Sequence, residues 1–138
     1  MKKLYEAKVT VEGGRNGHVR SDDGVIDMQV RMPEGLGGEG GNFTNPEQLF
    51  AAAYSVCYDG ALNLVAKQNR IKLNNTKVTA HVAIGKNEDG SLGLAAKLDV
   101  EIPDIDKNIA MDLMHKAHNF CPYSLAIKDN VEVELNLV

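Results

Sequence analysis

Two cysteines are the residues of this sequence with the most distinctive chemistry. Cys57 lies in the stretch AAAYSVCYDG (residues 51–60), and Cys121 lies in HNFCPYS (residues 118–124). A cysteine thiolate is a nucleophile, and once it is oxidised to a sulfenic acid, a second cysteine can capture it as a disulfide. The two cysteines together are therefore stronger evidence for redox chemistry than either cysteine alone. The sequence alone does not show that the two side chains meet.

Cys57 on its own is ambiguous. A cysteine on the apolar face of a buried helix ordinarily packs as a small hydrophobic residue. A site in the middle of a helix also gains nothing from the helix dipole, which acts over the first turn. Because a thiol with a pKa of ~8.5 is only a few per cent ionised at neutral pH, a reactive Cys57 needs a cation close by. The residues themselves leave an inert and a reactive cysteine open.

Zinc binding is a competing hypothesis, because His115, His118 and Cys121 are spaced three apart and Cys57 would complete a set of two cysteines and two histidines. Steps of three on a helix rotate by about 60° each, so these side chains fan out rather than converge. We therefore expect no bound metal. The run GLGGEGG (residues 35–41) lacks the Lys-Ser/Thr ending of a phosphate-binding loop, and we expect no bound cofactor either.

The element that must position Cys57 is a helix predicted over residues 46–69. Asn45 is a suitable N-cap, Pro46 suits the first helical position, and Gln48 stands where a capping box has Glu or Gln. The apolar residues cover an unusually wide face of this helix, which predicts a central helix buried on more than one side.

Alternating apolar and polar residues predict half-buried strands on either side of this helix. The expected strands cover residues 5–11, 26–32, 78–84, 92–102 and 131–137, with a shorter strand near 18–20 and a hairpin turn at NEDGS (residues 87–91). A second helix is predicted over residues 106–120 and is ended by Pro122. This order of elements predicts one α+β domain over residues 1–138.

Composition excludes some classes of partner. The net charge is -4, and the sequence has no Lys/Arg cluster that would neutralise successive phosphates, which argues against nucleic-acid binding. The N-terminal stretch MKKLYEAKVTVE has no uninterrupted apolar run, so it resembles neither a signal peptide nor a membrane span. We therefore expect a cytoplasmic protein with no membrane partner. In that reducing compartment the cysteines are expected to be buried or redox-active thiols rather than a structural disulfide.

Three stretches together resemble a known family. NPEQLFAAAYSVCYDGAL (residues 45–62), HNFCPYS (residues 118–124) and GGRNGHVRSDDGVID (residues 13–27) closely resemble the organic hydroperoxide resistance (Ohr) proteins of the OsmC superfamily. The resemblance covers nearly the whole chain. It implies an OsmC-like α+β fold in which antiparallel sheets surround long central helices, and an intertwined homodimer.

The resemblance also implies an activity, namely a thiol-dependent peroxidase that reduces organic hydroperoxides, including those of fatty acids, to alcohols. In this family pattern Cys57 resembles the peroxidatic cysteine and Cys121 the resolving one. Arg15 resembles the cation that stabilises the thiolate, and Glu47 the carboxylate that positions Arg15. The disulfide is typically reduced by a dithiol such as dihydrolipoamide on a lipoylated protein. An OsmC-type peroxidase with another peroxide preference, and a non-catalytic zinc or thiol redox module, are the alternatives.

Helix geometry adds one inference about these residues. Ten residues separate Glu47 from Cys57, which is about 15 Å along a straight helix and more than a glutamate side chain spans. Either Arg15 bridges part of this gap, or Arg15 and Glu47 come from another subunit. We favour the second hypothesis, because two such helices packed antiparallel would bring the first turn of one toward the middle of the other.

Two features depart from the family pattern. The segment Leu125 to Asp129, in LAIKDN, stands where members of the family usually have a small or polar residue and an Arg-Gly pair. Asp59 is acidic where we expect an apolar residue. Both departures bear on substrate preference more than on the reaction.

Overall fold

The computed structural model describes residues 1–138, which form two compact units, residues 1–49 and residues 50–138. Helix α1 (Pro46–Gln68) begins in the first unit and continues into the second. The structure is an α+β fold, as predicted. The single domain expected over residues 1–138 stays a prediction.

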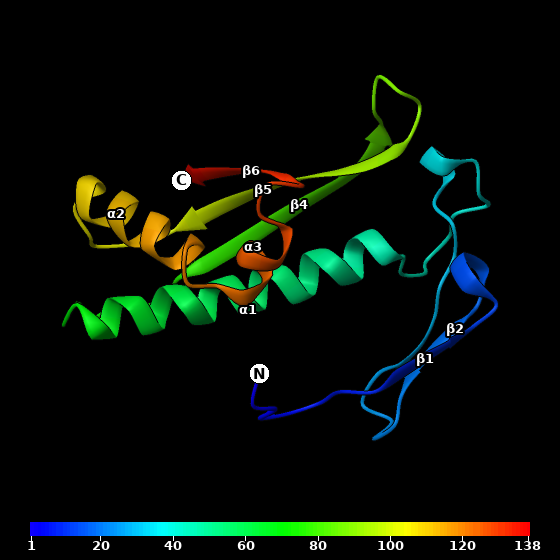
Figure 1. Ribbon diagram of the computed structural model, residues 1–138, viewed down its shortest axis with the longest axis horizontal. Helices are drawn as coiled ribbons and strands as arrows, with labels where there is room; N and C mark the ends of the chain where they lie inside the picture. The colour runs from blue at the N-terminus through cyan, green and yellow to red at the C-terminus, as the bar shows by residue number, and fades with distance from the viewer. The chain divides into compact units, whose positions relative to one another are not determined.

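The first unit contains a small antiparallel sheet. Its strands lie in the order β1 (Val9–Glu12), β2 (His18–Ser21) and β3 (Asp27–Gln29), with short 3₁₀ helices η1 (Gly14–Asn16) and η2 (Glu34–Leu36) in the connections (Figure 1). The short strand predicted near residues 18–20 is confirmed as β2. The strands predicted at 5–11 and 26–32 exist but are shorter than expected.

The burial predicted for the first strand is wrong within a single chain. Val9 and Val11 of β1 are 50% and 54% exposed, and Tyr5, which lies before the strand, is 82% exposed. Val19 and Val30 are the buried apolar residues of residues 1–49. An alternating pattern indicates which side chains share a face, but it does not say whether the same chain supplies the layer that covers them.

The second unit contains the remaining helices and a three-stranded sheet. Besides α1 these are β4 (Lys77–Lys86), β5 (Leu92–Glu101), α2 (Lys107–His118), α3 (Pro122–Ile127) and β6 (Glu132–Leu137), with the sheet order β4-β5-β6. β4 and β5 form the predicted hairpin, with an antiparallel register that places Ala80 opposite Leu98. β6 pairs with β5 in parallel, which corrects the expectation of purely antiparallel sheets. A parallel partner needs a long crossover, and α2 and α3 supply it.

The helix boundaries agree with the sequence patterns, apart from one helix that was not predicted. The Asn45 side chain caps α1 by accepting a hydrogen bond from the Gln48 N–H at 2.9 Å, and Asp106 caps α2 in the same way. The second predicted helix ends at His118, two residues before its predicted end and four before Pro122, and Pro122 begins α3. Proline suits the first position of a helix because its missing N–H would have had no partner there.

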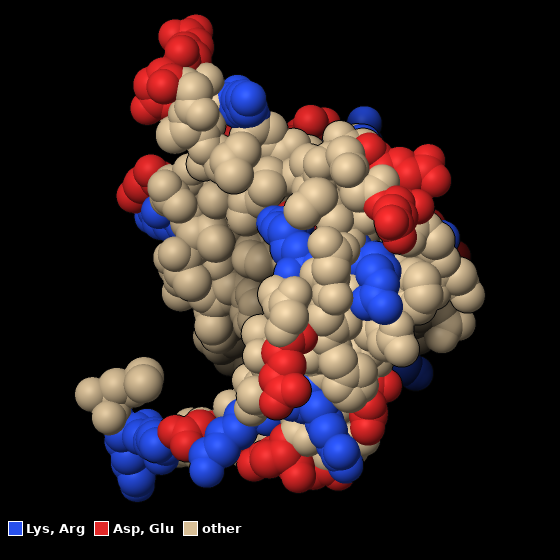
Figure 2. Space-filling model, turned by 90° about the vertical axis from the view of Figure 1, so that its right-hand side faces the viewer, with Lys and Arg blue, Asp and Glu red and all other residues tan.

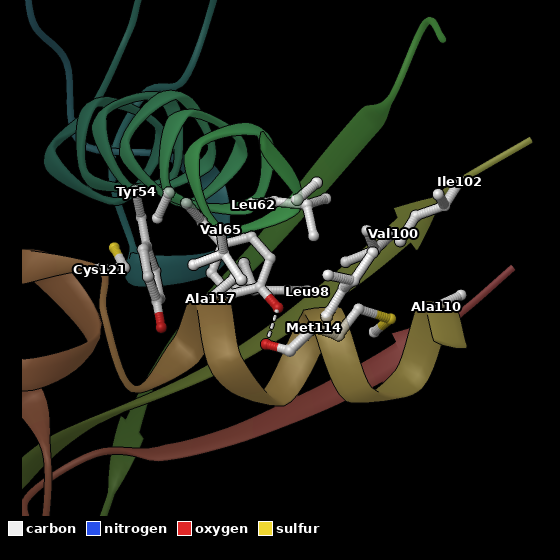
Figure 3. Close-up of a cluster of buried hydrophobic side chains, with 14 of the residues drawn as sticks. Tyr54, Leu62, Val65, Leu98, Val100, Ile102, Ala110, Met114, Ala117 and Cys121 are labelled. Carbon is white, nitrogen blue, oxygen red and sulfur yellow. Dashed lines mark hydrogen bonds between the residues drawn. The ribbon is translucent and has the colours of Figure 1, made fainter. Parts of the chain in front are cut away.

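The core of the second unit lies between α1, α2 and the sheet (Figure 3). Tyr54 and Leu62 of α1, Leu98 of β5 and Met114 of α2 belong to this cluster, and all four are fully buried (Figure 3). By length and composition α1 is also long and apolar enough to cross a membrane. Because one side of α1 is packed into this core, we interpret it as the core helix of a folded domain.

The opposite side of α1 is exposed, which corrects the prediction of a helix buried on more than one side. Ala52, Val56, Gly60 and Leu64 are spaced four apart, so they form one stripe along the helix, and all four are exposed. Val56 is 75% exposed and Leu64 is 43% exposed. The wide apolar face read from the sequence is real, but within one chain the stripe that contains Val56 and Leu64 is not covered.

Charged side chains of both signs are interspersed on the face of the molecule shown in Figure 2. A network of hydrogen bonds and ion pairs lies on the polar face of the second sheet, around Asp99 of β5. Asp99 accepts a hydrogen bond from Asn136 at 2.8 Å and pairs with Lys97 at 3.1 Å and His81 at 2.7 Å. These contacts, with the Asn136 bond first among them, lower the pKa of Asp99 from 3.8 to about 2.

Replacing Asp99 by asparagine is expected to lower the free energy of unfolding at neutral pH and to flatten its dependence on pH below about 4. The folded protein holds this carboxyl ionised down to a pKa of about 2. Its contribution is therefore complete above the unfolded pKa and is lost as the pH falls toward 2. Urea unfolding at several pH values checks this. Asp112→Asn, which removes the carboxylate paired with Lys116 on the surface of α2, is the control. An unchanged pH dependence in Asp99→Asn would contradict the assignment.

Candidate active site

The two cysteines meet. Cys57 lies in the middle of α1 and is partly buried, whereas Cys121 is the N-cap residue of α3 and is fully buried. The Cys121 thiol donates a hydrogen bond to Cys57 Sγ at 3.4 Å, and both cysteines are free thiols. A disulfide bond is about 2.05 Å long, so a small closing movement would join the two sulfur atoms.

A tight connection between α2 and α3 brings Cys121 to this position. The backbone N–H of Cys121 donates to the carbonyl of Ala117 at 2.8 Å, which ends α2. The carbonyl of Cys121 in turn accepts from the N–H of Leu125 at 3.0 Å, which begins α3. Cys121 therefore belongs to the hydrogen bonding of both helices, and its side chain lies at one end of the core, as does Tyr54 (Figure 3).

The environment of Cys57 within residues 50–138 disfavours the thiolate. Burial raises the pKa of Cys57, and the hydrogen bond from Cys121 raises it further. The backbone N–H of Tyr123, in the first turn of α3, acts in the opposite direction and lowers it. The requirement for a cation inferred from the sequence therefore persists in the structure.

Three aromatic side chains pack together on the two segments that carry the cysteines. Tyr54 stacks on Tyr123 with ring centroids 6.3 Å apart and an angle of 19° between the planes, and Phe50 contacts both rings edge to face. The Tyr54 hydroxyl shares a 2.9 Å hydrogen bond with the hydroxyl of Ser124. Phe50 and the exposed Tyr123 therefore offer an aromatic surface that suits an apolar molecule, whereas Tyr54 is fully buried beneath them.

Ser124 is a residue of this region that sequence reasoning passed over. It is 1% exposed and is the buried residue of α3. Its place three residues after Cys121, in a short segment that begins with proline, was the available signal. Without knowledge of α3, a serine there reads as part of a solvated loop.

Arg15 and Glu47 also meet. Their side chains form a bidentate pair, with Arg15 Nη1 3.0 Å from Glu47 Oε2 and Arg15 Nη2 2.8 Å from Glu47 Oε1. The hydrogen bond from Arg15 lowers the pKa of Glu47, and the hydrogen bond to Glu47 raises the pKa of Arg15. Such a fork fixes the orientation of the guanidinium as well as its charge.

Local backbone structure presents Arg15 on η1, between two glycines. Gly13 has a φ of 79°, in the left-handed region that favours glycine. A Cβ atom on Gly17 would lie 1.7 Å from the carbonyl oxygen of Glu12, so no other residue fits there. The run GGRNG is therefore explained by the tight turn that carries the arginine.

Asp59, one of the departures from the family pattern, has a local role. It accepts a hydrogen bond from the Thr76 hydroxyl at 2.7 Å, and the Asn63 amide donates to the same hydroxyl at 3.0 Å. These bonds tie α1 to the segment that leads into β4. Asp59 thus links α1 to the loop that contains Thr76.

The alternative zinc set is not assembled. The structure contains no group of three or more His, Cys, Asp or Glu side chains placed to hold a metal ion. Burial lowers the pKa of His118, and its Nδ1 atom is buried without a hydrogen-bond partner. The sequence-predicted site residues therefore form two pairs, Cys57 with Cys121 in the second unit and Arg15 with Glu47 in the first. A functional link between the two pairs stays a prediction.

Comparison with known proteins gives consistent results. The family model described as OsmC-like protein matches residues 38–136. The organic hydroperoxide resistance protein OhrB of Bacillus subtilis (strain 168) is 46% identical over 135 residues, which cover 97% of this chain and 98% of the relative.

Solved structures agree with this match. The crystal structure of an organic hydroperoxide resistance protein from Elizabethkingia anophelis is 52% identical, with a TM-score of 0.93, and covers 99% of this chain and 98% of the other. That of OhrB from Bacillus subtilis is 44% identical, with a TM-score of 0.90, and covers 99% of this chain and all of the other.

Proposed function

Since this chain belongs to the OsmC-like protein family, we propose that it is a cysteine-based peroxidase that reduces organic hydroperoxides, including those of fatty acids, to alcohols. The single observation that carries the proposal is the 3.4 Å contact between a partly exposed cysteine and a fully buried one. A peroxide reaches Cys57 first, and the thiol that must capture the product is already beside it. Relatives named for organic hydroperoxide resistance support the substrate class.

The proposed cycle has three steps. The Cys57 thiolate attacks one peroxide oxygen, the O–O bond breaks, and the alkoxide takes up a proton and leaves as an alcohol. Cys57 is now a sulfenic acid. The Cys121 sulfur attacks the Cys57 sulfur, the S–O bond breaks, and water leaves as the disulfide forms. An external dithiol then reduces the disulfide by thiol–disulfide exchange and becomes a disulfide itself. Dihydrolipoamide on a lipoylated protein is the proposed dithiol.

Arg15 is the proposed cation for the Cys57 thiolate, and Glu47 is the residue that orients it. Arginine stays charged at any working pH, so it both favours the thiolate and polarises the peroxide. Its bidentate contact with Glu47 supports this role, because a guanidinium fixed on one side presents its remaining N–H donors in a defined direction.

Replacing Arg15 by glutamine is expected to slow peroxide reduction at neutral pH by about 10- to 100-fold and to shift the rate profile to higher pH. Without the cation the pKa of Cys57 rises, so less thiolate is present at a given pH. Arg15→Lys should fall between the two, because it keeps the charge and loses the fork. Stopped-flow oxidation across the pH range measures the profile. Arg20→Gln removes an exposed arginine of β2 and should have no effect. An unshifted profile in Arg15→Gln would exclude Arg15 as the thiolate's cation.

The proposed assembly is an intertwined homodimer that acts as one functional domain per chain. The exposed stripe of α1 supports it, because alanine and glycine at Ala52 and Gly60 allow close approach of a second helix. The exposed Val9 and Val11 of β1 are a second apolar surface that a second copy would cover. A stable, fully active monomer in sedimentation experiments would refute the dimer.

A mixing experiment tests whether Arg15 acts on the cysteine of its own chain. Cys57→Ser and Arg15→Gln subunits are each expected to be nearly inactive. If Arg15 serves the partner's thiol, random mixing should restore about a quarter of the wild-type activity, since half of the dimers then contain one intact site of two. If Arg15 serves its own chain, mixing restores nothing.

The experiment that tests the proposed function is a peroxide-consumption assay with purified protein, dihydrolipoamide and cumene hydroperoxide. We expect sustained turnover, and much slower turnover with hydrogen peroxide. Equal or reversed rates would favour an OsmC-type peroxidase with another preference. No consumption of either peroxide, together with bound zinc on metal analysis, would favour a non-catalytic module. We place the activity in the cytoplasm, with no membrane or nucleic-acid partner.

A further inference from the structure

A second contact between α1 and α3 lies next to the contact between the two cysteines. Tyr54 lies three residues before Cys57 on α1, and Ser124 lies three residues after Cys121, so both members of this second pair are one helical turn away. The Tyr54 and Ser124 hydroxyls are 2.9 Å apart, and the Cys57 and Cys121 sulfur atoms are 3.4 Å apart. The two contacts form successive cross-connections between α1 and the start of α3.

Burial keeps the hydroxyls of Tyr54 and Ser124 facing each other. Tyr54 is 0% exposed and Ser124 is 1% exposed, so each hydroxyl depends on the other for its hydrogen bond. A buried hydroxyl without a partner is costly, which keeps the two groups facing one another. Burial also raises the pKa of Tyr54, so its hydroxyl stays protonated and available as a donor.

The first turn of α3 contacts Tyr54, whereas the last residue of α3, Ile127, packs against the core of the second unit. The helix is 6 residues long, and Pro122, Tyr123, Leu125 and Ala126 are exposed. Ser124 is its buried residue, and the Tyr123 ring is held by stacking on the ring of Tyr54. Tyr54 is therefore the residue on which the first turn of α3 is anchored twice, through its ring and through its hydroxyl.

We infer that Tyr54 and Ser124 are positioning residues that hold Cys121 against Cys57 for disulfide formation. This inference rests on the proposed function for its chemistry. In the second step the S–S bond forms as the S–O bond of the sulfenic acid breaks, which requires the Cys121 sulfur to approach along one direction. The hydroxyl pair restricts the motion of the turn that carries Cys121. Less conformational freedom is therefore lost when the disulfide forms. Both side chains are fully buried, so neither is placed to contact the peroxide.

The structure offers a matched control for the test. Tyr58 is a second fully buried tyrosine of α1, and its hydroxyl donates to the carbonyl of Met114 at 2.8 Å (dashed in Figure 3). Tyr58→Phe thus removes the same atom from the same helix, but it loosens α2 rather than α3. Tyr54→Phe keeps the ring that stacks on Tyr123 and removes only the hydroxyl.

The first arm measures the disulfide without peroxide, by equilibrating the cysteine pair with reduced and oxidised dithiothreitol. We expect the effective concentration of the two thiols to fall at least 5-fold in Tyr54→Phe and in Ser124→Ala. The double variant should fall no further, because both changes remove one contact. Tyr58→Phe should stay within 2-fold of wild type.

The second arm follows the reaction with cumene hydroperoxide in a stopped-flow instrument. Sulfenic acid formation should stay within 3-fold of wild type in all variants, whereas its conversion to the disulfide should slow at least 5-fold in Tyr54→Phe and Ser124→Ala. More Cys57 sulfinic acid should then be found by mass spectrometry, since an uncaptured sulfenic acid is oxidised again.

The inference is overturned if Tyr54→Phe and Ser124→Ala form the disulfide as readily as wild type, or if Tyr58→Phe impairs it equally. The two arms separate this result from failure of the proposed function. A wild-type protein that does not react with organic hydroperoxides would refute the peroxidase, while the dithiothreitol equilibrium would still decide whether the hydroxyl pair positions the thiols.

Discussion

The Cys57→Ser variant is expected to consume organic hydroperoxides at least about a thousand-fold more slowly than the wild-type protein. Serine has nearly the same size, but its hydroxyl is not ionised at neutral pH and does not form a sulfenic acid, so the attacking atom is lost. Peroxide consumption with dihydrolipoamide, measured by the loss of cumene hydroperoxide, checks the expectation. A variant with more than a tenth of the wild-type rate would show that Cys57 is not the nucleophile.

Folding of this variant is the necessary control, because Cys57 packs against the core of the second unit. Circular dichroism and the urea midpoint of Cys57→Ser should match those of the wild-type protein closely. Cys121→Ser serves as the matched comparison, since it makes the same atomic change on the other side of the 3.4 Å contact. Loss of the first oxidation event in Cys57→Ser, but not in Cys121→Ser, separates the two roles.

The Cys121→Ser variant is expected to complete one oxidation of Cys57 and then stall. Its first event should proceed within about threefold of the wild-type rate, because the attacking sulfur is unchanged. Steady turnover should fall by about a hundredfold, because an external thiol replaces an internal one already in contact. Mass spectrometry should detect sulfenic and then sulfinic acid on Cys57.

The contrary outcome for Cys121 is equally clear. Unimpaired steady turnover in Cys121→Ser would mean that the reductant acts directly on the Cys57 sulfenic acid, and that no intramolecular disulfide is needed. Absence of the first event would instead mean that Cys121 takes part in peroxide reduction itself. We expect neither, because Cys121 is buried away from the peroxide and its sulfur already lies 3.4 Å from that of Cys57.

Local patterns in the sequence predicted most of the elements. Alternation located β4, β5 and β6, and the cap formed by Asn45 located the start of α1 to within a residue. These features depend on neighbouring residues and on side-chain periodicity, which a single sequence displays directly. The same reasoning failed for α3, because a segment of 6 residues that begins with proline has too few residues to show a period.

Burial and strand direction were less predictable. The alternation in residues 5–11 and the wide apolar face of α1 were read as buried surfaces, yet Val9, Val11 and Val56 are exposed in the single chain. The parallel pairing of β6 with β5 was also missed. Burial depends on which layer covers an element, and strand direction depends on which strand lies beside it. The residues of the element itself do not specify these neighbours.

The sequence by itself determined the reagents of this protein: two cysteines, an arginine held in a glycine turn, and a long apolar helix to carry Cys57. The position of Cys57 by itself favoured an inert, packed thiol, and only the resemblance to a known family favoured a reactive one. The tertiary structure decided that Cys57 and Cys121 are in contact, that Arg15 and Glu47 form a bidentate pair, and that Tyr54 and Ser124 are joined beside the cysteines. The physical reason is that these contacts join residues far apart in the chain. Their formation depends on how whole helices and turns pack, whereas the identity of each residue fixes only what it does once a partner is there.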